Sequence, residues 1–148
     1  MKGDRVELLL AEVPEGVGDV RFRAFFHHFN AGRYYEAHDV LESLWLEQGR
    51  EHPDHRFHKG LIQLAGGFVH LRLQRMFPEH RAHGRRLGPA RRLFEVAARN
   101  LAGYPAWHHG FEVGQARQLL AQTIRALEEC PGVNPWDREG KPSLRGPG

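Results

Sequence analysis

Residues 55–75 carry apolar side chains on two sides at the spacing of an α-helix, and this feature constrains the fold most. With successive residues about 100° apart, one side holds Phe57, Leu61, Leu64, Phe68 and Leu71, and a second strip holds Ile62, Val69 and Leu73. Pro53 and Asp54 are signals for a helix start. A helix that is apolar on two sides needs other elements to cover both. The sequence therefore predicts a central helix within a bundle.

Four other segments repeat apolar residues at helical spacing, and none alternates as a strand does. Asp19 is a suitable N-cap for the first helix, and Gly32 is suited to follow its end. Gly88 and Pro89 form an N-cap and N1 pair for the fourth. We predict an all-α fold, a compact bundle of about five helices with short loops and an extended Pro/Gly-rich C-terminal tail. The helices are expected near residues 20–31, 34–48, 55–75, 89–102 and 112–129.

The segments outside these helices define the domain organisation. Residues 1–18 hold a short apolar patch followed by proline and glycine, which is typical of an arm and a turn. Residues 77–88 lose the apolar period and predict a loop. Residues 131–148 are rich in proline and glycine and predict an extended or partly disordered tail, pinned by Trp136. We expect an N-terminal arm, one helical bundle domain over residues 19–130, and this tail.

The bulk properties indicate a cytoplasmic protein. The 148 residues are enough for one domain to bury a core without disulfides. The single cysteine, Cys130, cannot form an internal disulfide, which favours a reducing compartment. No signal peptide is visible, and the most apolar stretch, residues 60–71, is too short to span a membrane and contains Gln63 and His70. We expect no membrane partner, and the sequence sets no oligomeric state.

Polar residues interrupt the apolar faces of two predicted helices. On the helix over residues 34–48, His38 and Glu42 are four residues apart, so they are neighbours at the margin of the buried arc. The central helix has a polar strip that includes Gln63 and His70, and it also contains two adjacent glycines. Glycine inside a helix costs ~1 kcal/mol relative to alanine, which suggests that the 34–48 helix or a ligand approaches the backbone there. We predict that these four polar residues pack into one cluster between the two helices.

Three interpretations of this cluster remain open at the level of the sequence. It is a structural hydrogen-bond network, a binding site for a small molecule or a protein partner, or a site for a divalent metal ion. The predicted ligand-binding residues are His38, Glu42, Trp45, Gln63 and His70. The predicted metal ligands of a metal-assisted hydrolase are His38, Glu42 and His70, although no H-E-x-x-H or E-x-x-H pattern supports them. Neither an enzymatic reaction nor a cofactor is determined.

The other histidines are predicted to lie on the surface. His52, His55 and His58 form an H-x-x-H-x-x-H series, and two adjacent pairs occur at residues 27–28 and 108–109. Eleven histidines in a polar chain produce such spacings by chance, so surface positions are the stronger expectation. Phosphate-binding loops and the G-x-S-x-G motif are absent from the sequence, which argues against nucleotide-driven and serine-dependent chemistry.

Basic charge is concentrated in one part of the chain. Residues 72–99 hold eight arginines against two glutamates, whereas residues 1–58 hold seven basic and eleven acidic residues. Arg85, Arg86 and Arg92 are the candidate contacts to nucleic-acid phosphates. No helix-turn-helix and no aromatic stacking platform accompanies them, so a solvated face is favoured and nucleic acid is an unfavoured partner.

The residues that mark the second and third predicted helices resemble a known family. The run F-N-x-G-x-Y-x-E-A-H-D-x-L-E-x-x-W over residues 29–45, G-L-I-Q-L-A over residues 60–65 and His70 resemble the family called domain of unknown function 309. The G-F-E-V run over residues 110–113 is similar to the start of that family's last helix. The resemblance implies a compact helical bundle and implies no reaction. The Arg-rich connection over residues 77–88 is longer than the family pattern.

Overall fold

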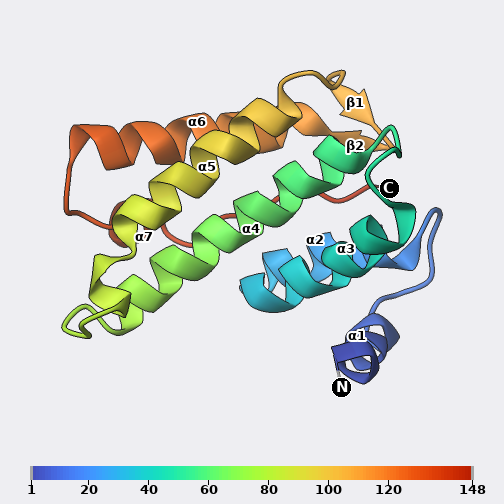
Figure 1. Cartoon of the computed structure of the whole chain (residues 1–148), viewed down its shortest axis with the longest axis horizontal. Coiled ribbons are helices and arrows are strands. Elements are labelled where there is room, and N and C mark those ends of the chain that lie inside the picture. Colours follow the sequence, from blue (N-terminus) through green and yellow to red (C-terminus); the bar gives the residue numbers. More distant parts are fainter. Residues whose placement is uncertain (1, 148) are drawn as a thin grey trace.

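Helices make up nearly all of the regular structure, and α4 passes between two groups of helices (Figure 1). The computed structural model describes residues 2–147, without the side chains of residues 2, 138 and 139. None of the described helices is both long enough and apolar enough to cross a membrane. The elements are α1 (Lys2–Ala11), α2 (Val20–Asn30), α3 (Tyr34–Gln48), α4 (His55–Met76), η1 (His83–Arg85), α5 (Leu87–Leu101), β1 (Trp107–His108), β2 (Phe111–Glu112), α6 (Val113–Glu129) and α7 (Trp136–Glu139).

The start of α2 and the ends of α2 and α3 follow capping signals of the sequence, and the predicted all-α class is confirmed. Asp19 caps α2, because its Oδ1 accepts a hydrogen bond of 2.8 Å from the backbone N–H of Arg21. Gly32 and Gly49 follow α2 and α3 with φ of 79° and 82°, where glycine has no steric cost. The bounds of α3 coincide with the prediction, and α4 ends one residue beyond it, at Met76.

Parts of the chain differ from expectation. The segment predicted as an arm contains α1, and α5 begins at Leu87 rather than at Pro89. Proline is tolerated there because the first N–H groups of a helix have no intrahelical partner. Strands β1 and β2 form an antiparallel hairpin in which His108 pairs with Phe111. Strands of two residues are too short to show an alternating pattern, so periodicity could not reveal them.

The packing places α4 at the centre of the bundle. Helix α5 packs along one side of α4 and α3 along another, while α2 covers α3 and α6 covers α5 (Figure 1). Helix α1 lies at the edge against α2 and α3. Large aromatic side chains fill the interior, and those that are fully buried include Phe25, Phe29, Phe57, Phe94 and Phe111. Both predicted apolar sides of α4 are therefore covered.

Glycines on α4 allow α5 to approach closely. A Cβ at Gly67 would lie 2.3 Å from Cε1 of Phe94, and one at Gly60 would lie 2.8 Å from Cγ of Leu101. A Cβ at Gly66 would meet Cδ2 of Leu93 at 2.9 Å. The element that approaches this backbone is therefore α5, and the expectation that it would be the 34–48 helix or a ligand was wrong.

The C-terminal segment returns along the bundle to the end where α4 begins (Figure 1). Trp136 packs edge-on against Tyr34, with ring centroids 5.5 Å apart. Leu144 is 1% exposed, and its backbone N–H and carbonyl both bond to the side chain of Asn30, each at 2.7 Å. These contacts hold the last residues beside α2.

The contact of α4 with α5 yields a stability prediction. We expect Gly67→Ala to lower the free energy of unfolding by ~1 to 3 kcal/mol, because the new methyl group would overlap the ring of Phe94. This loss opposes the gain of up to ~1 kcal/mol that alanine brings to a helix. Urea unfolding followed by circular dichroism measures the difference.

Gly114→Ala is the matched control for this measurement. A Cβ at Gly114 meets only Oε1 of Glu112, at 3.9 Å, so helix propensity should leave the stability unchanged or raise it. If Gly67→Ala were as stable as Gly114→Ala, the close approach of α4 and α5 would not constrain the packing.

Candidate functional site

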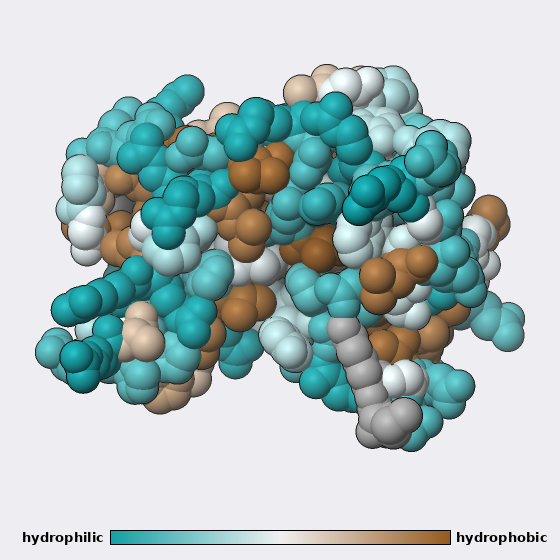
Figure 2. Space-filling model, in the orientation of Figure 1, coloured by the Kyte–Doolittle hydropathy of each residue, from teal (hydrophilic) through white to brown (hydrophobic). Residues whose placement is uncertain are grey.

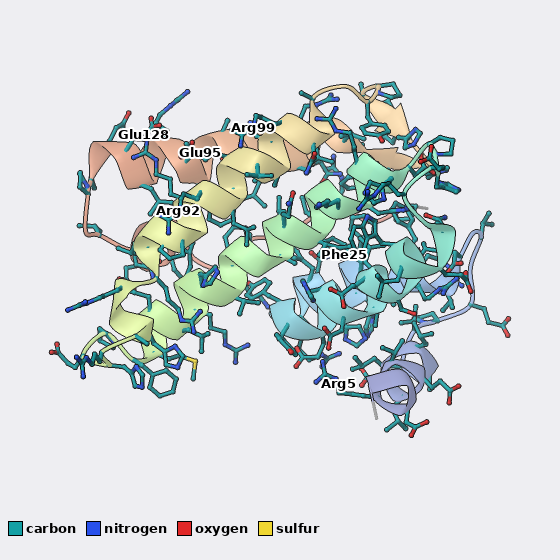
Figure 3. The ribbon with its side chains drawn as sticks, viewed as in Figure 1. Arg5, Phe25, Arg92, Glu95, Arg99 and Glu128 are labelled. Carbon is teal, nitrogen blue, oxygen red and sulfur yellow. The ribbon has the colours of Figure 1, made fainter. Side chains whose placement is uncertain are left out.

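His38 and Glu42 lie beside each other on α3, on the side that α1 contacts. His38 Nε2 is 3.6 Å from Oε2 of Glu42, and His38 Nδ1 is 3.1 Å from Oδ1 of Asp39. Asp39 is buried and forms an ion pair with Arg5, which Figure 3 shows on α1. Arg5 also lies over the ring of Tyr35, with its Cζ 5.0 Å from the ring centroid. This part of α3 therefore contributes to the docking of α1.

Trp45 and Gln63 have other surroundings. The indole Nε1–H of Trp45 donates to the carbonyl of His55 at 3.1 Å, and the ammonium of Lys59 lies 5.6 Å from its ring centroid. Gln63 Oε1 accepts a hydrogen bond of 2.7 Å from Asn100 of α5. Trp45 thus borders the junction of α3 and α4, whereas Gln63 belongs to the contact of α4 with α5.

His70 lies near the start of α5. Arg86 Nη1 is 2.8 Å from His70 Nδ1, and Arg86 Nε donates to His83 Nδ1 at 2.7 Å. Burial lowers the pKa of His70, and the nearby charges of Arg86 and Arg92 lower it further. The imidazole is therefore neutral at neutral pH.

The structure places the predicted site residues in separate neighbourhoods rather than in one cluster. The physical reason is that α5 covers the face of α4 that carries the glycines, Gln63 and His70. Among the described residues, the possible metal ligands that converge on α3 are His38, Asp39 and Glu42, and His70 is not with them. A ligand-binding role for His38, Glu42, Trp45, Gln63 and His70 stays a prediction.

Two of the three candidate phosphate contacts, Arg85 and Arg92, are exposed. The third, Arg86, is partly buried with His70 and His83, as described above. The surface over the loop after α4 is largely hydrophilic (lower left of Figure 2). Phosphate binding by these three arginines also stays a prediction.

Acidic residues interrupt the basic face of α5. Glu95 lies between Arg92 and Arg99 along the helix, and Glu128 lies near them on α6 (Figure 3). Arg91 forms ion pairs with Glu95 at 3.0 Å and with Glu128 at 2.9 Å. A surface of mixed charge attracts the phosphates of a nucleic acid less than a basic stripe would.

A cleft of about 1200 Å³ lies at the other end of the molecule, where α4 begins. The loop over residues 13–19 forms one wall, and α2 and α3 contribute apolar side chains from Phe22, Phe26 and Leu44. The turn of the hairpin and the end of the C-terminal segment, Gly146 and Pro147, complete the border. Segments far apart in the sequence therefore enclose one space.

Three histidines and an aspartate line the cleft near the start of α4 and the hairpin: His52, Asp54, His58 and His109. Asp19, Arg23 and His27 also line it, at the start of α2 and along that helix. The carboxylate of Asp54 connects the start of α4 to the hairpin. His108 Nε2 is 2.7 Å from Oδ1 of Asp54, and His109 Nε2 is 2.6 Å from Oδ2. Asp54 occupies the N-cap position of α4 but makes no capping bond with its side chain. The carboxylate binds the hairpin instead of the helix end.

The charge state of Asp54 follows from these contacts. Burial raises the pKa of Asp54, but the hydrogen bonds from His108 and His109 together outweigh burial, so its pKa lies below the ordinary value. The carboxylate is therefore ionised at neutral pH and can only accept hydrogen bonds. Each histidine consequently carries a proton on Nε2 and directs it at Asp54.

A tight turn orients the two adjacent histidines. The hairpin loop consists of His109 and Gly110, with φ of 52° and 74°, the pattern of a type I′ turn. Neighbouring residues of a strand point to opposite faces, but the left-handed backbone at His109 lets both imidazoles reach Asp54. A positive φ is uncommon for histidine, and residues held in such conformations cluster at functional sites.

His58 is buried beneath this cluster, so its predicted surface position was wrong. It is 2% exposed, and its Nδ1 is 2.9 Å from Oε1 of Gln48. Burial lowers the pKa of His58 to about 4, although the charge of Asp54 acts in the opposite direction. His108 and His109 are more open, with side chains 23% and 48% exposed.

These histidines stand out in the sequence, but their convergence on Asp54 was not predicted. The H-x-x-H-x-x-H series flanks the start of α4, and the adjacent pair precedes a glycine. A His-Gly pair between two short apolar stretches is compatible with a type I′ turn, which was the available signal for a hairpin. His58, the last of the series, and His108, the first of the pair, are 50 positions apart in the sequence, and nothing in the sequence indicates that the two groups meet.

The low pKa of His58 predicts a loss of stability in acid. The unfolded chain binds a proton at His58 as pH falls below about 6.5, whereas the folded chain does so only near pH 4. The contribution is fully present above about 6.5 and should decrease by ~3 kcal/mol as pH falls to 4. Urea unfolding at a series of pH values measures this slope.

The variant His58→Gln should flatten that slope between pH 6.5 and 4, because glutamine does not titrate and can still donate to Gln48. His80→Gln, at an exposed loop position, is the control and should leave the slope unchanged. An equal slope in the parent chain and in His58→Gln would show that the pKa of His58 does not differ between the folded and the unfolded chain, contrary to this prediction.

Comparison with known proteins adds a family match. Residues 22–76 match the model of a family described as Domain of unknown function (DUF309), which confirms the resemblance over most of α2, α3 and α4. The match includes Asp54 and His58 but ends before the hairpin with His108 and His109. No curated protein and no solved structure matches the chain.

Proposed function

We propose that this protein binds a small organic molecule in the cleft beneath the 13–19 loop. The observation that carries the proposal is a space of about 1200 Å³ that is lined by apolar residues and has His52, Asp54 and His109 together near the hairpin. Asp19, Arg23 and His27 also border this space. Ligand sites in proteins are concave, mostly apolar and supplied with a few converging polar groups. The apolar part of the ligand would lie against Phe22, Phe26 and Leu44, and a polar group would face His52 and His109.

The part of the cleft near the hairpin indicates which ligand group it would recognise. In the neutral imidazole of His109 with its proton on Nε2, the other ring nitrogen, Nδ1, has a lone pair. That nitrogen can accept a hydrogen bond from a hydroxyl or amino group of the ligand. Asp54 would stabilise the imidazolium if the ligand gave up its proton, as carboxylates do for catalytic histidines. The ligand class that fits is therefore an apolar molecule with one hydrogen-bond donor.

Exposed apolar surface beside the cleft supports the same conclusion. Val17 is 95% exposed at the tip of the 13–19 loop and lines the cleft. Covering such a side chain with a bound molecule is favourable, because apolar area is removed from water. The loop would gain packing partners when the cleft is filled.

The other functions considered from the sequence have less support. The predicted ligand-binding residues contact different neighbours in the structure, so they do not face one common space. These residues are His38, Glu42, Trp45, Gln63 and His70. A metal-assisted hydrolase on His38, Glu42 and His70 meets the same difficulty, and nucleic-acid binding meets the mixed charge of α5. The proposed cytoplasmic location still rests on the single cysteine. Binding, and not catalysis, is what we propose.

Titration with the fluorophore anilinonaphthalene sulfonate, an anion with apolar aromatic rings and a secondary amine, tests the proposal. We expect saturable binding to the folded chain, and Val17→Glu should raise the dissociation constant at least ~5-fold, because a charged group replaces apolar surface that the probe covers. Val17 is exposed, so this substitution should not change the stability.

Leu8→Glu is the matched control, since Leu8 is 72% exposed on α1 and does not line the cleft. Both variants add the same charge, which corrects for repulsion of the anionic probe. Absence of saturable binding to the parent chain would contradict the proposal, as would equal weakening by the two variants.

A further inference from the structure

We propose that Asp54, His108 and His109 form a binding site for one divalent transition-metal ion, with zinc as the representative member. The inference deepens the proposed function, because the ion would lie in the part of the same cleft near the hairpin. One ligand atom from each residue lies within 4.8 Å of the other two. When ligand atoms bind one ion at about 2.0 to 2.2 Å, the distances between those atoms are shorter than this limit. Small side-chain rotations would therefore bring the three ligand atoms to binding distance from an ion.

The donor set selects the class of ion. Two imidazole nitrogens and one carboxylate oxygen suit zinc, iron, manganese and related first-row ions. Magnesium and calcium prefer oxygen ligands and would bind weakly here. Three protein ligands also leave a coordination position for water or for a polar group of a molecule in the cleft.

Asp54 can exchange its hydrogen-bond donors for an ion. The groups that now donate to it are imidazoles, and a neutral imidazole can move its proton from Nε2 to Nδ1. The lone pairs of both Nε2 atoms would then face the ion together with a carboxylate oxygen. With the ion bound, the ligand's hydroxyl or amino group would occupy the open coordination position instead of bonding to Nδ1 of His109. The shift of the proton changes the net charge of neither imidazole. The carboxylate of Asp54 stays negative and partly neutralises the cation.

The surrounding structure holds these ligands in place. Asp54 is fixed by its backbone N–H, which donates to Nδ1 of His52 at 3.0 Å. The ring of His108 packs edge-on against Phe57, with centroids 4.7 Å apart, and its centroid lies 4.2 Å from that of His109. Rigid support of this kind lowers the cost of ordering ligands around an ion.

Two other groups of possible ligands among the described residues are less suitable. Both ring nitrogens of His28, in the group with Glu12 and His27, are already bonded to Leu9 and Arg33. In the group of His38, Asp39 and Glu42, the guanidinium of Arg5 already neutralises Asp39. A cation would have to displace these contacts.

The left-handed backbone at His109 allows a substitution, His109→Asn, that removes a metal ligand without straining the turn. Asparagine adopts a positive φ more readily than histidine, and Asn-Gly is the favoured pair for a type I′ turn. His109→Asn should therefore keep the geometry of the turn while it removes one ligand and one of the two hydrogen bonds to Asp54. A purely structural histidine would show the opposite pattern, a loss of stability with nothing else affected.

Isothermal titration calorimetry with zinc chloride tests the site. The protein is the full chain without an affinity tag. We expect one zinc ion bound to this site in the parent chain, and His109→Asn and Asp54→Asn should each raise the dissociation constant at least ~10-fold. The double variant His80→Gln with His83→Gln removes a pair of stacked histidines in the loop after α4 and should bind zinc as the parent does. Magnesium chloride should give no comparable binding.

The outcomes separate this inference from the proposed function. Zinc affinity that is unchanged in His109→Asn, or reduced equally in the His80 and His83 double variant, would overturn the metal site. Thermal unfolding of His109→Asn, measured on the same sample, distinguishes a loss of folding from a loss of the zinc ligand. Val17→Glu should weaken the binding of the fluorophore but not the binding of zinc. Either proposal can therefore fail while the other stands.

Discussion

The close approach of α4 and α5 is the constraint on which the rest of the structure depends. It requires the absence of side chains at Gly60 and Gly67, where Leu101 and Phe94 occupy the space that a Cβ would fill. With α5 pressed against this face, α3 takes another side of α4, and α2 and α6 cover the outside. The start of α4 is thereby placed beside α2 and the hairpin, where the cleft forms.

Asp54 connects this framework to the candidate site. It begins the central helix, so its position is set by the packing of the whole bundle, and its carboxylate holds the hairpin through two histidines. A buried carboxylate that bonds to two imidazoles contributes to the fold and is also suited to bind a ligand or an ion. The site therefore combines a rigid helix start with a turn that holds histidine in an uncommon backbone conformation.

Several features could be predicted because they depend on neighbours in the sequence. Asp19 as an N-cap, Gly32 after α2 and the two apolar sides of α4 are local signals, and the structure contains all three. The glycines at residues 66 and 67 correctly indicated a close approach, but the partner was wrong. Which helix faces a glycine depends on the path of the whole chain, and no local pattern records that path.

The sequence by itself determined the all-α class, the main helices and the presence of unusual polar residues, because helical periodicity and capping act over a few residues. Only the tertiary structure decided which of those polar residues meet. His38 and His70 looked like partners and lie with different neighbours, whereas Asp54 and His109 are separated by a long stretch of chain and are in contact. The reason is that hydrogen bonds between distant residues form where packing brings their helices and turns together, and packing is a property of the complete fold.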